Sequence, residues 1–190
     1  MEIHEIFIST LAIDWLDVDN DKLATFCRDK AYNSEWYKNA QQSQSENLID
    51  CDEFKELLKL VTVKLNEFHV AMGLSNNYTQ EIFECWANVN SSKAISVPHL
   101  HQDSMFSCVY YVVGSDDTGS INFMNPVQSK GLIIQAKHIG TDNSFNIDSY
   151  NCTPVVGKLI IFPSYLYHYV NNFNGSERIS IAFNSRFLGV

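Results

Sequence analysis

Glycine and proline are distributed very unevenly along this 190-residue chain. All four prolines and seven of the eight glycines come after residue 97, and Gly73 is the exception. Because these residue types mark turns and interrupt helices, the sequence predicts helices in the first part and short strands joined by turns in the second. No internal repeat or linker divides the chain. We therefore expect a single domain over residues 1–190, with a helical support region at 1–80 and a β-rich core at 81–190.

The first part of the chain predicts two helices. One begins at Asp19 or Asn20 and runs to about Ala31. The other covers residues 54–72, where apolar side chains recur every three or four positions until Gly73 can terminate the helix. An opening strand is expected within 3–13, and the polar segment 33–47 is expected to be a loop.

The second part predicts about eight short strands, which favours a β-sandwich or jelly roll with the helices on one outer face. The expected strands lie at 81–89, 101–113, 120–124, 132–134, 144–147, 158–162, 167–171 and 178–186.

Charge excludes several classes of partner. Residues 1–84 hold 16 acidic and 7 basic residues, which accounts for the net charge of −9, and residues 85–190 hold six of each. Without a basic stripe, we expect no nucleic-acid partner and no docking on anionic membranes. No apolar run approaches a membrane span, no signal peptide is evident, and five scattered cysteines fit reduced thiols. The sequence thus predicts a cytoplasmic protein that is not secreted.

A cluster of histidines carries the strongest chemical signal. In a strand, side chains alternate between faces, so His99, His101 and Asp103 would point to one side. His168 follows much later in the chain. Two histidines and one carboxylate on one side of a metal form the facial triad typical of non-haem Fe(II) oxygenases. A short His-x-Asp match is common by chance, and each histidine alone could be structural.

Arg178 strengthens the functional interpretation, because it follows His168 by ten residues and shares a strand face with Ser180. Its guanidinium could bind a carboxylate through two parallel hydrogen bonds. The alternative is a surface arginine paired with Glu177 or Asp148. We favour the functional interpretation.

The ordered set of motifs over residues 85–185 resembles the Fe(II)/2-oxoglutarate-dependent dioxygenases, in particular the 2OG-Fe(II) oxygenases of marine bacteria and their phages. The matching segments are 86–88 (Trp-Ala-Asn), 99–101 (His-Leu-His), 109–112 (Val-Tyr-Tyr-Val), 122–126 (Asn-Phe-Met-Asn-Pro), 157–164 and 178–184. The resemblance implies an α+β protein whose core is a double-stranded β-helix, the cupin-like jelly roll.

The resemblance also implies which residues bind the metal. Iron would be held by His101, Asp103 and His168. His99 is the alternative ligand, because relatives of the phage type carry a His-x-His pattern that would give a three-histidine site. We favour Asp103, since a carboxylate is a harder ligand that suits Fe(II).

For the rest of the pocket, the resemblance implies that Arg178 binds the distal carboxylate of 2-oxoglutarate. The residues expected to assist it are Ser180 and Tyr111. The candidates for the substrate side of the pocket are Trp86, Asn88, Tyr110 and His99. Of these, Tyr110 has the opposite strand parity and fits better outside the pocket, while Trp86 and Asn88 could equally be core residues.

The implied activity uses Fe(II), 2-oxoglutarate and O2. It couples decarboxylation of 2-oxoglutarate to succinate with oxidation of a C–H bond, by default hydroxylation, in an unknown protein side chain such as a peptidyl proline or in a small molecule. The alternatives are a cupin-like metal enzyme that does not use 2-oxoglutarate and a non-catalytic jelly-roll module. The sequence leaves the oligomeric state open, a homodimer included.

Overall fold

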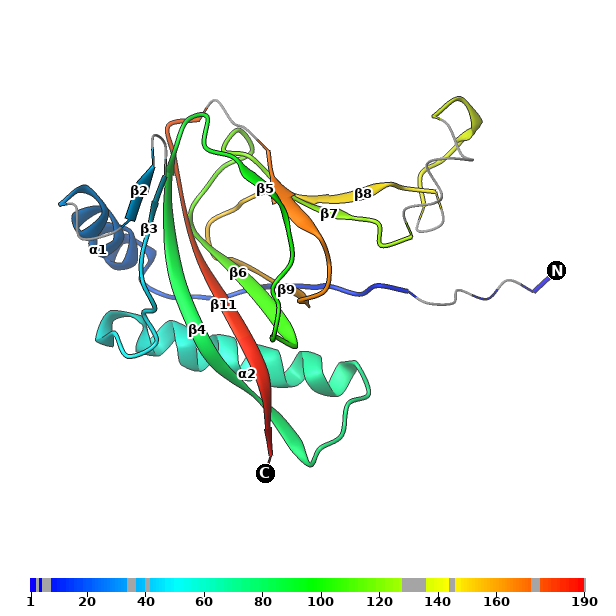
Figure 1. Cartoon of the computed structure of the whole chain (residues 1–190), viewed down its shortest axis with the longest axis horizontal. Coiled ribbons are helices and arrows are strands. Elements are labelled where there is room, and N and C mark those ends of the chain that lie inside the picture. The colour runs from blue at the N-terminus through cyan, green and yellow to red at the C-terminus, as the bar shows by residue number, and fades with distance from the viewer. Residues whose placement is uncertain are drawn as a thin grey trace.

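The computed structural model describes residues 1–2, 4, 8–33, 37–39, 42–127, 136–143, 146–171 and 175–189. Two antiparallel sheets form the body of the protein (Figure 1). The larger sheet has the order β1-β9-β6-β11-β4-β3-β2, and the smaller has the order β5-β10-β7-β8. The expected α+β jelly roll, a double-stranded β-helix, is confirmed.

The strands of the larger sheet are β1 (Ala12–Trp15), β2 (Tyr37–Asn39), β3 (Gln42–Gln44), β4 (Tyr78–Ser91), β6 (Phe106–Val113), β9 (Lys158–Pro163) and β11 (Glu177–Gly189). Those of the smaller sheet are β5 (Ser96–His99), β7 (Ile121–Met124), β8 (Ser149–Cys152) and β10 (His168–Val170). Two helices, α1 (Asn20–Tyr32) and α2 (Lys55–Ala71), and two short 3-10 turns, Asp52–Phe54 and Ala136–His138, complete the described elements.

The helices form as the sequence predicts. The Asp19 side chain accepts a hydrogen bond from the Lys22 backbone N–H at 2.9 Å and so caps α1. Leu57, Val61 and Leu65 form the buried stripe of α2. Neither described helix is long and apolar enough to cross a membrane.

The helices cover one face of the larger sheet (Figure 1). Alternate residues of β4, β6 and β11 point to this side and pack with α1 and α2 into the main core. The largest fully buried side chains on those strands are Tyr110, Phe106, Phe183, Ile179 and Ile181. The opposite face turns toward the smaller sheet, and a second apolar cluster that includes Tyr111, Phe123, Ile160 and Phe162 joins the two sheets.

Several expected boundaries are wrong. The strand expected at 101–113 begins only at Phe106, because a turn occupies 102–103. The segment 33–47, expected as a loop, contributes β2 and β3, which form a polar hairpin on the edge of β4. Of the opening strand expected at 3–13, residues 12 and 13 lie in β1, which pairs with β9, while residues 3 and 5–7 lie outside the described residues.

Of the remaining expected strands, residues 132–134 lie outside the described residues, as do 144 and 145. Residues 146 and 147 are not in a strand. Two strands were not expected, β5 and β8. Both are short and largely exposed, so neither has the apolar alternation that marks a strand in a sequence.

Candidate metal centre and cosubstrate pocket

Three histidines converge where the two sheets meet. His99 ends β5 and lies directly opposite His168, the first residue of the neighbouring strand β10. His101 follows after one residue, and its backbone N–H donates to the Ser164 carbonyl at 3.1 Å. One ring nitrogen of each histidine lies within 4.8 Å of the others, so the three imidazoles can share one metal ion.

The hydrogen bonds of two histidines fix which nitrogen faces the centre. Nδ1 of His168 lies 2.9 Å from the Leu166 carbonyl, and Nδ1 of His99 lies 2.8 Å from the Val97 carbonyl. A carbonyl oxygen can only accept, so each Nδ1 carries the proton and each Nε2 presents a lone pair. A metal-binding histidine commonly donates its second ring N–H in this way.

The spacing of the imidazoles also fits a metal. Nε2 of His101 and Nε2 of His168 are 3.3 Å apart. Two nitrogens that bind one ion at about 2.1 Å and at roughly a right angle would be about 3 Å apart. Burial lowers the pKa of His101 to about 4, with a further contribution from His99, and burial lowers the pKa of His168 to about 3. Both rings are therefore neutral at physiological pH, as metal binding requires.

Asp103 lies outside this group. It is exposed, stands in a turn and has a φ of 61°. The expectation that Asp103 shares a face with His99 and His101 assumed one continuous strand, but β5 ends at His99 and β6 begins at Phe106. Aspartate tolerates this left-handed backbone conformation better than most residues, which gives the acidic residue a role in the turn itself.

The face of the larger sheet that turns toward the smaller sheet is called the inner face, and the face covered by the helices is called the outer face. Arg178 is buried on the inner face and is 4% exposed. Its guanidinium donates to the carbonyls of Thr118 and Gly119 at 2.9 and 3.0 Å and to Oδ1 of Asn90 at 3.1 Å. Burial lowers the pKa of Arg178, but a guanidinium stays protonated in proteins. Asn90, which sequence reasoning did not identify, lies directly opposite Arg178 on β4, a pairing between residues 88 positions apart.

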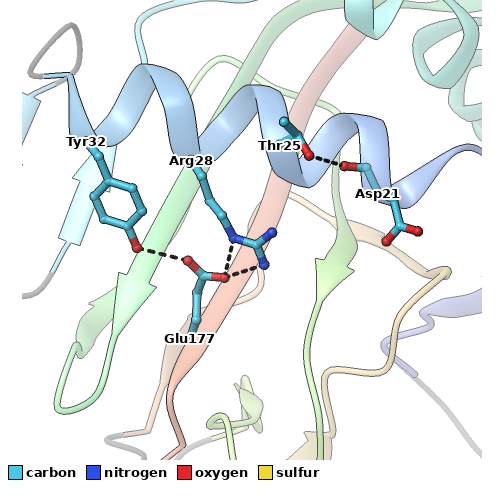
Figure 2. Close-up of polar contacts among 5 residues, drawn as sticks. All are labelled: Asp21, Thr25, Arg28, Tyr32 and Glu177. Carbon is cyan, nitrogen blue, oxygen red and sulfur yellow. Dashed lines mark hydrogen bonds and ion pairs between the residues drawn. The ribbon is translucent and has the colours of Figure 1, made fainter.

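Glu177, the alternative partner proposed for Arg178, points the other way. Arg28 on α1 donates through Nε and Nη2 to Oε2 of Glu177 at 2.8 and 2.7 Å, and the Tyr32 hydroxyl donates to Oε1 at 3.0 Å (Figure 2). Successive residues of β11 thus serve opposite sides of the sheet. Glu177 fastens α1, and Arg178 enters the inner face.

Ser180 and Tyr111, the residues expected to assist Arg178, are close to it in the larger sheet. Ser180 pairs with Tyr111 of β6 on one side and with Asn88 of β4 on the other. Strand alternation places Ser180 on the same face as Arg178. Burial raises the pKa of Tyr111, which therefore remains a phenol and a hydrogen-bond donor.

Trp86, on the same face of β4 as Asn88, packs its ring against that of His101, with the ring centres 5.6 Å apart. Tyr110 is not in the pocket. It belongs to the main core under α1, and its hydroxyl donates to Asn20 at 2.8 Å. The odd strand parity of Tyr110 already indicated this position, so its inclusion among the pocket candidates is wrong.

One protein family matches the part of the chain that holds these residues. Residues 84–184, more than half of the chain, match the family described as "Putative 2OG-Fe(II) oxygenase". The matched region contains the three histidines and Arg178. Among curated protein sequences, none matches this chain significantly.

Solved structures share the fold. A Pseudomonas putida prolyl-4-hydroxylase is 18% identical, with 95% of this chain and 94% of that chain covered and a TM-score of 0.65. HygX from Streptomyces hygroscopicus, solved with nickel, 2-oxoglutarate and hygromycin B, is 8% identical (93% and 82% covered, TM-score 0.61). A prolyl hydroxylase in complex with a hypoxia inducible factor peptide fragment from Trichoplax adhaerens is 12% identical (92% and 82% covered, TM-score 0.61).

At these identities the solved structures establish the fold, and the matched family establishes the class of enzyme. The chain belongs to the 2OG-Fe(II) oxygenase family and is a non-haem enzyme that uses Fe(II), 2-oxoglutarate and O2.

Proposed function

We propose that the metal ligands are Nε2 of His99, His101 and His168, and that the distal carboxylate of 2-oxoglutarate binds Arg178 with help from Ser180 and Tyr111. The observation that carries this proposal is the convergence of three imidazoles whose ligand nitrogens lie within 4.8 Å of one another. This ligand set corresponds to the alternative that the His-x-His pattern raised. Binding of the metal by Asp103 remains an untested prediction, and we favour His99 as the third ligand instead.

Each group in the pocket has a defined task in this proposal. Fe(II), when bound, supplies the redox chemistry that amino-acid side chains lack. The Arg178 fork orients 2-oxoglutarate, and the Tyr111 hydroxyl donates a hydrogen bond to the cosubstrate. The rings of Phe123 and Phe162 pack against His168, with ring centres 6.0 and 4.9 Å away, and exclude water from that side.

We infer that the reaction is a hydroxylation. The substrate C–H becomes C–OH with one oxygen atom from O2, while the other oxygen atom enters succinate as 2-oxoglutarate loses CO2. Two of the similar structures are prolyl hydroxylases, one of them in complex with a peptide, and HygX was solved with the small molecule hygromycin B. We therefore propose a peptidyl proline as the first substrate to test and a small molecule as the second.

The two alternative functions considered for the sequence explain fewer of the observed features. In a cupin-like enzyme without 2-oxoglutarate, Arg178 would serve only its hydrogen bonds to Thr118, Gly119 and Asn90. In a non-catalytic jelly roll, the three histidines would not need to converge. Both disagree with membership of the matched family.

We also propose a cytoplasmic location. The five cysteines are free thiols, and four of them are buried, which fits a reducing compartment. The acidic surface of the first 84 residues gives no support for a nucleic-acid or anionic membrane partner.

The test is succinate formation from 2-oxoglutarate with Fe(II), ascorbate and a panel of proline-containing peptides and small molecules. We expect a product one oxygen atom heavier than its substrate. Arg178→Ala should lower turnover at limiting 2-oxoglutarate by about 100-fold, the loss typical of a buried charged hydrogen-bond partner. Arg186→Ala is the matched control, because Arg186 lies on the same strand in an exposed ion pair with Glu81. Equal turnover in Arg178→Ala and wild type would contradict the proposal.

A further inference from the structure

A chain of polar side chains lies beneath the loop that carries His101. The Oγ atoms of Ser164 and Ser107 are 2.8 Å apart, and Ser107 Oγ donates to Oδ1 of Asn184 at 2.8 Å. Nδ2 of Asn184 then donates to Oε2 of Glu84 at 2.7 Å. The first three residues are almost fully buried, and Glu84 is exposed. Sheet register places Glu84, Asn184 and Ser107 directly opposite one another on β4, β11 and β6.

The hydrogen bonds of this chain all run in one direction. A hydroxyl has a single proton, and Ser107 gives its proton to Asn184, so Ser164 must be the donor to Ser107. Asn184 accepts through its oxygen and donates through its nitrogen. The chain therefore ends on the Glu84 carboxylate, and an anion at that end strengthens each preceding bond.

One end of this hydrogen-bonded series bonds to the His101 loop, and the other end shares a strand face with Trp86, which packs on His101. Ser164 closes the His101 loop, since its carbonyl accepts from the His101 N–H and its own N–H donates to the Met105 carbonyl, each at 3.1 Å. Glu84 shares the inner face of β4 with Trp86, whose ring packs on His101. Glu84 thus stands two positions along β4 from the side chain that packs against His101, on the face that turns toward the smaller sheet.

We propose that Glu84 is an anionic positioning residue of the three-histidine centre. It holds the His101 loop through Asn184, Ser107 and Ser164, and it places a carboxylate beside a cation bound by the histidines. The inference rests on the ligand set proposed above. Three neutral imidazoles bring no negative charge to a divalent metal, and Glu84 supplies through space the charge that a carboxylate ligand would supply directly.

The test measures binding of Co(II) alone to the metal-free full chain by visible absorption, so it requires no substrate. Glu84→Gln keeps an oxygen that can accept from Asn184 but removes the charge. The double variant Glu84→Gln/Asn184→Asp returns the charge one strand away, and the introduced glutamine can then donate to the introduced aspartate. Glu81→Gln is the matched control, because Glu81 lies on the same strand and pairs with Arg186 at 2.8 Å.

We expect Glu84→Gln to raise the Kd for Co(II) by about tenfold, the lower end for residues that support metal ligands. The loss should shrink as salt screens the exposed charge. The double variant should return close to the wild-type Kd, and Glu81→Gln should leave it unchanged. A merely structural hydrogen bond would survive Glu84→Gln and would not produce this pattern.

Three results would overturn the inference: wild-type affinity in Glu84→Gln, an equal loss in Glu81→Gln, or no recovery in the double variant. If wild type binds one Co(II) and His168→Ala binds none while Glu84→Gln is unaffected, the inference on Glu84 fails and the proposed metal site stands. If wild type binds no Co(II), both fail.

Discussion

The two faces of the larger sheet differ sharply although the same strands form them. Toward the helices, β4 presents Cys85, Ala87 and Val89, all buried in the main core. Toward the smaller sheet, the intervening residues are Trp86, Asn88 and, further along, Asn90. β11 repeats the pattern, with apolar residues at 179, 181 and 183 facing the helices and polar ones at 178, 180 and 184 on the opposite face.

Because successive residues of a strand point to opposite faces, one strand can stabilise the fold through one set of residues and form the site through the other. The outer face buries apolar area under α1 and α2. This packing fixes the position of β11, the strand that carries Arg178 and Ser180. The inner face can then bury polar groups whose hydrogen bonds are satisfied across the sheet. Within the described residues, every buried side-chain nitrogen and oxygen has a hydrogen-bond partner.

The largest predicted effect is a loss of stability caused by a substitution on the outer face. Phe183 is fully buried in the main core, and Phe183→Ala should lower the free energy of unfolding by about 3–5 kcal/mol. Denaturant unfolding measures this loss. Co(II) binding by the protein that remains folded should be nearly unchanged, and a folded variant that has lost the metal site would show that the faces are not separable.

A smaller effect should come from the inner face. Arg178→Lys keeps the positive charge but loses the planar fork, so the KM for 2-oxoglutarate should rise about tenfold, or about 1.4 kcal/mol. Steady-state succinate formation at varied 2-oxoglutarate gives the value. Stability should change less than in Phe183→Ala. An unaltered KM would mean that Arg178 does not bind the cosubstrate through two hydrogen bonds.

The ion pair between Arg28 and Glu177 (Figure 2) allows a test of whether the two faces are independent. Glu177 and Arg178 are adjacent in sequence, but their side chains lie on opposite faces of the sheet. Arg28→Met keeps an apolar stem and removes the ion pair. Since the Arg28 side chain is 42% exposed, we expect a loss of stability of only about 0.5–1 kcal/mol that diminishes at high salt. The KM for 2-oxoglutarate serves as the control and should stay at its wild-type value.

The last effect appears only at alkaline pH and concerns the thiol of Cys27, a buried residue of α1. Burial raises the pKa of Cys27 to about 12, so the folded protein keeps this proton at pH values where the unfolded chain, with a thiol pKa near 9, loses it. Stability from this group is therefore complete below about pH 9 and declines as pH rises toward 12, by at most about 1.4 kcal/mol per unit. Unfolding of wild type and Cys27→Ala between pH 8 and 10.5 should show a shallower decline in the variant. Parallel curves would contradict the raised pKa.

Much of this division could be predicted from the sequence. The placement of glycine and proline predicted helices before strands, and the apolar spacing of 54–72 predicted α2, because both signals are local. The shared strand face of Arg178 and Ser180 was predicted for the same reason, since both lie within β11.

The remaining features depend on contacts between distant segments. The turn at Asp103 contains no glycine or proline, so nothing local revealed that the strand had ended. β5 is four residues long and partly exposed, and it forms because β10, about 70 residues later, pairs with it. Asn90 and Glu84 gained their roles only when β11 paired with β4.

The central claim is that three histidines, and not Asp103, bind the metal. The most direct measurement is Co(II) titration of wild type, His99→Ala and Asp103→Ala under identical conditions. We predict one Co(II) per chain in wild type and in Asp103→Ala, and affinity reduced by 100-fold or more in His99→Ala, about the loss expected when a buried charge loses a partner. Retained binding in His99→Ala together with lost binding in Asp103→Ala would contradict the account.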